Sequence, residues 1–276
     1  MYLSSVLKES CFATIATISE DSIEKLKLFS EYNQPLIKQF NHIILSTNSA
    51  EGINSTDIET YHKEWRKLYP NSVVLHTEVN KGHMFGTIDL EERILTYIKK
   101  ELPEVKYLWK SMDDVITSSE ILKIEVKEAD FYYTPGFSLE SINKAGGREN
   151  LRKTFETYES GFWTPQTTFF ILNITNIDSL YGDDIDIKKL VYEEAKAYAP
   201  SVKPWEIPLD IKFDCETHLG RTTKDLKKHC LVEDQFEELL EMVYYHRMGD
   251  PSHKNIYFYR PGICHYHFYK DLIFNV

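Results

Sequence analysis

The stretch Phe12-Ala-Thr-Ile-Ala-Thr-Ile18 is a run of apolar and β-branched residues that predicts a buried β-strand. Three further runs of this kind follow in the first 110 residues, and apolar residues at helical spacing separate them. The four predicted strands cover residues 12–18, 42–47, 72–77 and 105–109. Parallel neighbours need a crossover, and a helix is the usual one, so the alternation predicts an α/β fold with a mostly parallel sheet flanked by helices.

The predicted helices carry start signals. Asp21 and Glu24 are placed to cap the first helix, and Thr56 with Glu59 fits a capping box for the second. The third helix is predicted from about Thr87 to Glu101, after a loop that contains glycines.

The second half is less regular and predicts a mixed region. Strands are expected over residues 131–134, 168–172, 256–260 and 265–268, and helices over 151–158, 190–198 and 235–247. Neither an internal repeat nor a low-complexity linker divides the chain. We therefore predict one domain over 1–276, with a ligand-binding half in 1–120 and a second half in 121–276.

Composition excludes several classes of protein. The chain has 32 Lys and Arg against 43 Asp and Glu, a net charge of −11, so binding to a nucleic-acid backbone is not expected. The longest apolar run, near residues 169–172, is too short to span a membrane, and no signal peptide is visible. Four scattered cysteines without a CxxC motif favour a reduced, cytoplasmic protein.

The sharpest motif is Tyr107-Leu-Trp-Lys-Ser-Met-Asp-Asp-Val115, an apolar strand that ends in Asp113 and Asp114. In parallel α/β sheets ligands bind beyond the carboxyl ends of the strands. Carboxylates there suit Mg²⁺ or Mn²⁺, which keeps open positions for diphosphate oxygens. The alternative is a turn whose aspartate caps a following helix.

Three other segments are candidates. The glycines of Asn80–Asp89 let the backbone approach an anion at a helix N-terminus, although an ordinary loop would look the same. His265 and His267 share one face of a strand, so either could complete a metal site, or pack on aromatic neighbours instead. Asp214 or Glu216 could take a proton from an acceptor hydroxyl, or lie on a polar strand face.

Taken in their order along the chain, the predicted strands, the Asn80 loop and the acidic pair resemble those of glycosyltransferases of the GT-A fold. This is the nucleotide-sugar-dependent class that includes family 2. The resemblance covers about the first 120 residues. The donor loop of that class reads Asn-x-Gly-x-x-x-Ala-Arg-Asn; Asn80 and Gly82 fit it, while Thr87 and Ile88 stand where Arg and Asn are usual.

The acidic motif and the tail extend the resemblance. Asp113-Asp114 is a shortened form of the class's Asp-x-Asp, and some members use a C-terminal histidine as a metal ligand, a place that His265 or His267 would fill.

The resemblance implies a hexosyltransferase with a nucleoside diphosphate sugar as donor and a glycan or other hydroxyl as acceptor. Mn²⁺ or Mg²⁺ on the two aspartates would bridge the phosphates as a Lewis acid. The base and ribose would contact residues from the first two loops, namely Thr17, Ser19, Glu20 and Asn48. Positive charge would come from Lys110, Lys81 or Lys254, and the second half would shape the acceptor pocket.

The stereochemical outcome stays open at this point. An inverting enzyme needs a carboxylate base, for which Glu216 is the first candidate and Asp214 the second, whereas a retaining enzyme would not need it.

Two alternatives remain. A non-catalytic nucleotide- or carbohydrate-binding protein of the same fold would explain the missing Arg and Asn of the donor loop. A sugar-nucleotide nucleotidyltransferase would need a Gly-rich, Arg-containing loop after the first strand, and Ser19-Glu-Asp-Ser22 has neither residue.

Overall fold

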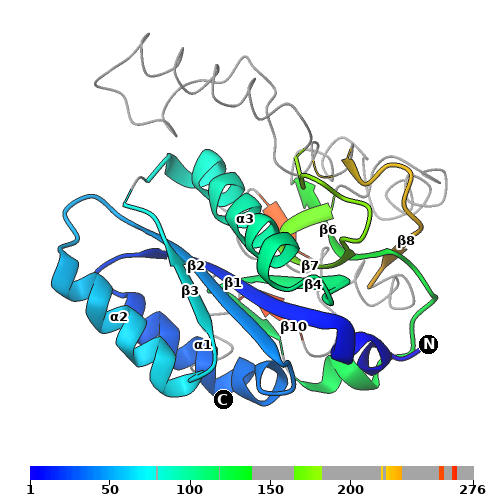
Figure 1. Cartoon of the computed structure of the whole chain (residues 1–276), viewed down its shortest axis with the longest axis horizontal. Coiled ribbons are helices and arrows are strands. Elements are labelled where there is room, and N and C mark those ends of the chain that lie inside the picture. Colours follow the sequence, from blue (N-terminus) through cyan, green and yellow to red (C-terminus); the bar gives the residue numbers. More distant parts are fainter. Residues whose placement is uncertain are drawn as a thin grey trace, which may run out of the picture.

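The computed structural model describes residues 1–78, 80–117, 119–138, 165–181, 219, 222–231, 255–257 and 263–265. A central sheet separates two layers of helices: α1 (Ser22–Ile37) and α2 (Ser55–Leu68) lie on one face, and α3 (Gly82–Glu101) lies on the other (Figure 1).

The first half forms the parallel part of the sheet. Its strands are β1 (Ser10–Ile18), β2 (His42–Ser49), β3 (Val73–His76) and β4 (Tyr107–Met112), in the spatial order β3-β2-β1-β4. β1 pairs in parallel with both β2 and β4, and β2 pairs in parallel with β3. The predicted α/β fold is therefore confirmed, and β1 is the strand around which the sheet is built.

The second half continues the sheet in mixed orientation. β7 (Pro165–Asn173) pairs antiparallel with β4 and with β6 (Phe131–Ser138), and β6 also pairs with β8 (Lys228–Cys230) and β9 (Asn255–Tyr257). A separate two-stranded sheet joins β5 (Val115–Thr117) to β10 (Ile263–His265). Short 3₁₀ helices cover Leu3–Glu9 and Ser119–Lys123. The predicted mixed region is confirmed, whereas the division into two halves stays a prediction.

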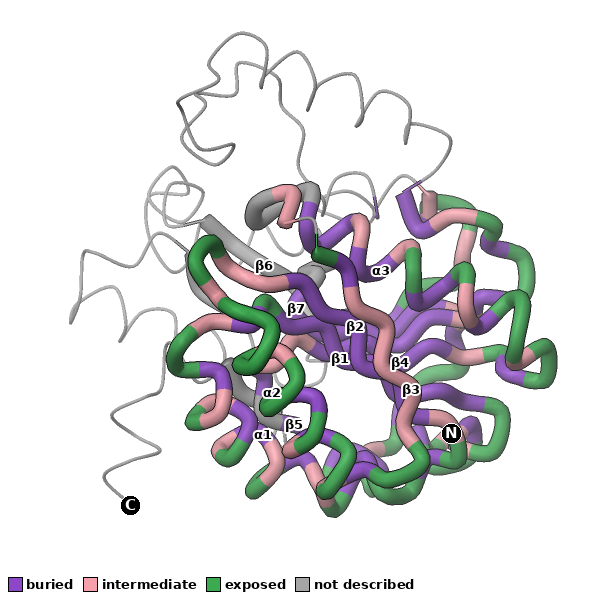
Figure 2. Tube along the Cα trace, turned by 60° about the vertical axis from the view of Figure 1, so that its left-hand side comes forward, coloured by how far each residue is buried: buried purple, intermediate pink, exposed green. Residues whose placement is uncertain are grey.

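Both faces of the sheet are buried, which explains why the strands read as continuous apolar runs. Side chains alternate between the faces along each strand. The face under α3 packs residues such as Cys11, Ala13, Ile15, Ile44, Ile94 and Leu108. The face over α1 and α2 packs residues such as Phe12, Ala16, Leu45, Phe29, Trp65 and Trp109. Figure 2 shows the central strands buried and the outer sides of the helices exposed.

Several helix starts differ from the predictions. Asp21 occupies the N-cap of α1 but makes no side-chain cap bond there. The capping box at Thr56 and Glu59 is wrong, because Asn54 caps α2 by accepting a hydrogen bond from the Asp57 N–H at 3.0 Å.

The third helix starts earlier than predicted, at Gly82 rather than Thr87, so much of the expected loop is helix. Glycine weakens a helix by about 1 kcal/mol, which made the segment read as a loop, but packing of the turns that follow outweighs this cost.

The alternative in which an aspartate caps a following helix does not hold, since the acidic pair leads into β5. The helices predicted over 151–158, 190–198 and 235–247 lie outside the described residues, and the last predicted strands differ in their bounds from β9 and β10. Among the helices that are described, none has the length and apolar character needed to cross a membrane.

Candidate functional site at the carboxyl edge of the sheet

The carboxyl ends of β1, β2 and β4 bring three predicted segments to one edge of the sheet. Thr17 of β1 lies opposite Asn48 of β2 in the parallel register. On the other side of β1, the N–H of Asp113 donates to the carbonyl oxygen of Ile15 at 3.1 Å, which ties the residue after β4 to the central strand. The first two loops and the acidic turn therefore meet.

The loop after β1 leaves candidate side chains open to solvent. Thr17 is exposed within a strand that is otherwise buried, and Glu20 is exposed beyond it. Ser19 donates from its hydroxyl to Asp21 Oδ1 at 2.5 Å and from its backbone N–H to Ser22 Oγ at 2.7 Å. The Ser19 hydrogen bond, helped by Lys25, lowers the pKa of Asp21 despite partial burial. This loop is an ordered turn beside an accessible strand end.

The end of β2 and the start of α3 form a tight group of two amides and a glycine. Asn48 is buried, and Asn80 donates from Nδ2 to the carbonyl oxygen of Ser49 at 3.0 Å. A Cβ atom at Gly86 would lie 3.1 Å from Asn48 Nδ2 and 3.7 Å from Asn80 Oδ1. Within the described part of the chain, Asn48 Oδ1 has no hydrogen-bond partner. Glycine at position 86 thus lets α3 approach both amides closely.

The acidic turn lies between β4 and β5, with both Asp113 and Asp114 half-buried. β10 pairs antiparallel with β5, so that His265 lies opposite Val115, the residue after Asp114. The C-terminal segment is therefore brought beside the acidic turn, as the metal hypothesis requires. The imidazole of His265 lies outside what the structure describes, and its role as a ligand stays a prediction.

The donor set of the turn fits a hard divalent cation, because it offers adjacent carboxylates on a backbone fixed by a hydrogen bond to β1. Among the side chains that are described, three or more His, Cys, Asp or Glu residues do not gather into a metal-holding group. Water and phosphate oxygens would have to complete the coordination, which is how Mg²⁺ is usually bound.

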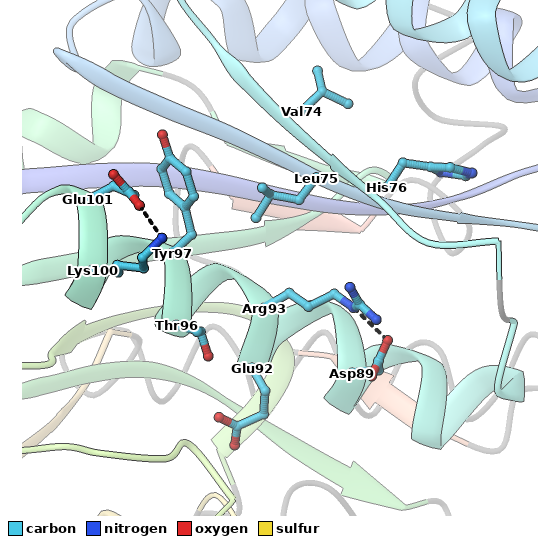
Figure 3. Close-up of a pocket in the computed structure, with 10 residues that line it drawn as sticks. All are labelled: Val74, Leu75, His76, Asp89, Glu92, Arg93, Thr96, Tyr97, Lys100 and Glu101. Atoms are coloured by element: carbon cyan, nitrogen blue, oxygen red, sulfur yellow. Dashed lines mark hydrogen bonds and ion pairs between the residues drawn. The ribbon is translucent and has the colours of Figure 1, made fainter.

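The side chain of Lys81 forms an ion pair with a carboxylate of α3. Its Nζ lies 2.6 Å from Asp89 Oδ1, and Arg93 Nε lies 2.8 Å from Asp89 Oδ2, as Figure 3 shows for the second pair. Burial raises the pKa of Asp89, but hydrogen bonds and charge from Lys81 and Arg93 outweigh it, so the pKa is lowered. The ammonium predicted to face a diphosphate is thus paired with a carboxylate further along α3.

Lys110 lies in the core. Its Nζ is 2.6 Å from Glu91 Oε1, and both side chains are fully buried between β4 and α3. Tyr181 donates from its hydroxyl to Glu91 Oε2, and the Lys110 ammonium lies 5.7 Å from the centre of the Phe170 ring. This placement differs from the predicted contact between Lys110 and a diphosphate. Glu91 thus lies on the buried side of α3.

The remaining predicted site residues are Asp214, Glu216, Lys254 and His267, and they lie outside the described residues. Gly82 is the first residue of α3.

Two buried polar residues near the site were missed from the sequence. Asn33 is fully buried on α1, and Glu91 is fully buried on α3. Each interrupts an apolar stripe at helical spacing: Asn33 follows Phe29 by four residues, and Glu91 precedes Leu95 by four. A polar residue on a buried stripe is the signal that could have revealed them.

A pocket of about 560 Å³ lies between the edge strand β3 and α3 (Figure 3). Leu75 and Tyr97 form its apolar part, and charged residues of α3 surround them. The predicted site residues that are described do not line it, but its lining reaches the carboxyl end of β3 at His76 and includes Asp89, the partner of Lys81.

No family model matches the sequence, and no curated protein matches it. Solved structures similar to the chain include the apo form of the glycosyltransferase GlyE from Streptococcus pneumoniae TIGR4, with 9% identity and a TM-score of 0.39. That match covers 87% of this chain but 50% of GlyE, so the chain spans about half the length of that protein. A galactosyltransferase, LgtC, in complex with donor and acceptor sugar analogues, shows 10% identity and a TM-score of 0.41 over 79% of this chain and 72% of LgtC. Matches this weak do not transfer an activity to the chain.

Proposed function

We propose that the chain is a glycosyltransferase of the hexosyltransferase type, which moves a sugar from a nucleoside diphosphate sugar to the hydroxyl of a glycan or another acceptor. The observation that carries the proposal is the meeting of the β1 end, the Asn48–Asn80–Gly86 group and the acidic turn at one sheet edge. Recognition groups for a nucleotide and carboxylates for a divalent ion then lie next to one another.

The nucleoside part of the donor would bind at the ends of β1 and β2. Exposed Thr17 and Glu20 and half-buried Ser19 offer hydroxyl and carboxylate oxygens, and the unused Asn48 Oδ1 offers an acceptor for a ligand N–H or O–H group. Asn80, Lys81 and Gly82 would approach the diphosphate from the start of α3, where backbone N–H groups lack helical partners.

Asp113 and Asp114 would hold Mn²⁺ or Mg²⁺, with His265 or His267 as a further ligand. When bound, the ion would stabilise the charge that develops on the leaving diphosphate. The two carboxylates also keep this end of the sheet acidic when no ion is bound, so a bare diphosphate would be repelled.

In this proposal, residues of the second half, 121–276, form the binding site for the acceptor. Glu216, or Asp214 in second place, would remove the proton from the acceptor hydroxyl in an inverting reaction, and Lys254 would add positive charge near the phosphates. The free, buried thiol of Cys11 agrees with a reducing compartment, and we propose the cytoplasm.

The test is turnover of a panel of sugar nucleotides with and without Mn²⁺, using the full chain. Asp114→Asn should abolish the Mn²⁺-dependent release of nucleoside diphosphate. Asp178→Asn is the matched control, because Asp178 is an exposed carboxylate that pairs with Lys99 on α3. Absence of both binding and turnover across the panel would contradict the proposal.

The second candidate is a non-catalytic nucleotide- or carbohydrate-binding protein of the same fold. The pairing of Lys81 with Asp89 and of Lys110 with Glu91 favours it, because these two cations are already neutralised. Tight nucleotide binding that is unaffected by Mn²⁺ and unaccompanied by turnover would support this candidate over the enzyme.

A further inference from the structure

The side chain of Asn33 on α1 replaces a neighbouring strand along one edge of β5. Its Nδ2 donates to the carbonyl oxygen of Val115 at 3.1 Å, and its Oδ1 accepts from the N–H of Thr117 at 2.6 Å. In a strand the carbonyl of one residue and the N–H two residues later point to the same side. One amide therefore bonds the Val115 carbonyl and the Thr117 N–H of this edge, as an adjoining backbone would.

The amide of Asn33 is itself firmly held. Its Nδ2 also donates to the carbonyl oxygen of Phe29, one turn earlier in α1, at 2.9 Å. The side chain is fully buried among the apolar residues of its helix face. Both N–H donors of the group and its oxygen are thus engaged, which fixes the amide orientation.

β5 is the segment that leaves the acidic turn. On one side of the turn, the N–H of Asp113 is bonded to the carbonyl oxygen of Ile15. On the other side, Val115 directly follows Asp114 and is bonded to Asn33. The two aspartates therefore lie between two backbone anchors, one on β1 and one on α1.

The same contact controls what lies on the far edge of β5. Because Asn33 uses groups of Val115 and Thr117, the backbone groups of Ile116 face β10, whose register places His265 opposite Val115. A shift of β5 would move the acidic turn and the C-terminal segment relative to each other.

We propose that Asn33 is a positioning residue for a divalent cation held at Asp113 and Asp114: it fixes β5 and thereby both the acidic turn and the strand that pairs beside it. This inference rests on the proposed function, since it assumes that the turn binds the ion. Asn33 itself does not contact the ion or the substrate.

The test is titration of the full chain with MnCl₂ alone, with free Mn²⁺ followed by electron paramagnetic resonance. Asn33→Asp keeps the acceptor for Thr117 but loses both donors, and Asn33→Ala removes the whole amide. We expect either variant to weaken Mn²⁺ binding by about tenfold or more, the usual effect of losing a residue that orients a ligand. Leu26→Ala is the matched control, because it destabilises the same buried face of α1.

The outcomes separate the two proposals. If Leu26→Ala lowers the unfolding temperature as much as the Asn33 variants but binds Mn²⁺ normally, the positioning role is supported. If wild type binds Mn²⁺ and the Asn33 variants bind it equally well, the positioning role is overturned while the proposed function stands. If wild type binds no Mn²⁺, the metal site of the proposed function fails, and the positioning role fails with it.

A measurement on the wild-type protein tests the positioning role even if the Asn33 variants do not fold. Saturating Mn²⁺ should slow hydrogen exchange of the Thr117 amide, because fixing the acidic turn also fixes β5. Unchanged exchange of this amide in the presence of bound Mn²⁺ would overturn the positioning role.

Discussion

Lys110 Nζ lies 2.6 Å from Glu91 Oε1 with both side chains fully buried, and this ion pair joins the central sheet to α3. Removing one member of a buried pair leaves the other charge without compensation, at a cost of about 3–5 kcal/mol. Lys110→Met should lower the free energy of unfolding by about this amount, measured by chemical denaturation. Replacing both residues, Lys110→Met with Glu91→Leu, should recover most of the loss.

The control for this prediction is Lys106→Met, since Lys106 Nζ pairs with Glu9 Oε1 at 2.6 Å on the surface. Exposed pairs contribute about 0–1 kcal/mol, so a Lys110 variant that costs no more than the Lys106 variant would contradict the structural role.

His62 should make the stability depend on pH. Burial, together with the charges of His76 and Arg66, lowers the pKa of His62 from 6.5 to about 4. The unfolded chain therefore binds a proton on this residue between pH 6.5 and about 4 that the folded chain does not, and the free energy of unfolding falls as the pH falls through this window.

The measurement is urea unfolding at a series of pH values, with His62→Gln as the variant. In the variant, the free energy of unfolding should depend less steeply on pH than in wild type. Some dependence should remain because His76 also titrates. Burial also lowers the pKa of His76, with Arg93 lowering it and Glu78 and Thr47 raising it. An equal slope in both proteins would rule His62 out as the source.

Gly86→Ala should weaken ligand binding while changing stability little. The new methyl carbon would lie 3.1 Å from Asn48 Nδ2, so that amide must shift, while alanine favours the helix by about 1 kcal/mol. Crowding of this kind costs about 1–3 kcal/mol of stability, which the gain in helix propensity partly offsets. Losing one hydrogen bond from the displaced Asn48 amide would cost about 0.5–1.5 kcal/mol of binding, or roughly two- to tenfold in nucleoside diphosphate affinity measured by calorimetry with Mn²⁺.

Gly52→Ala provides the contrast for Gly86. Gly52 has φ of 85°, and a Cβ atom there would have open space within 4 Å, so alanine should cost about 1–2 kcal/mol of stability through backbone strain alone. The variant adds no atom beside Asn48, so equal losses of affinity in the Gly52 and Gly86 variants would count against the Asn48 contact.

Asp89→Asn should strengthen the binding of anionic ligands at the start of α3. The change releases Lys81 and Arg93 from their shared carboxylate. We expect nucleoside diphosphate affinity to rise about two- to fivefold at low salt and to return towards the wild-type value at high salt, because screening weakens exposed charges. Asp178→Asn releases Lys99 instead and should show no such gain.

Much of the parallel half could be predicted because its signals are local. Apolar β-branched runs with both faces buried identified β1, β2 and β4 within a few residues. The three-residue strand β5 could not be predicted this way. It exists because Asn33 binds one edge and β10 binds the other, and both partners are distant in sequence.

The sequence predicted which segments lie at the carboxyl edge of the sheet, but not the pairing of two lysines with carboxylates of α3. The order of motifs placed Asp113 and Asn80 at one edge, which follows from parallel topology. The locations of Lys110 and Lys81 depend on their pairing with Glu91 and Asp89 of α3, and these contacts between distant residues are not specified by a local pattern.

The position of β1 between β2 and β4 has a consequence for biosynthesis. β1 leaves the ribosome before both of its neighbours, and β2 follows after one helix, but the strand for the other edge of β1 ends only at Met112. Until then a nascent apolar strand with an open edge is exposed to other chains, the condition under which edge-to-edge aggregation occurs. Slower translation between β2 and β4 should therefore lower the yield of folded protein, and a chaperone that covers that edge should raise it.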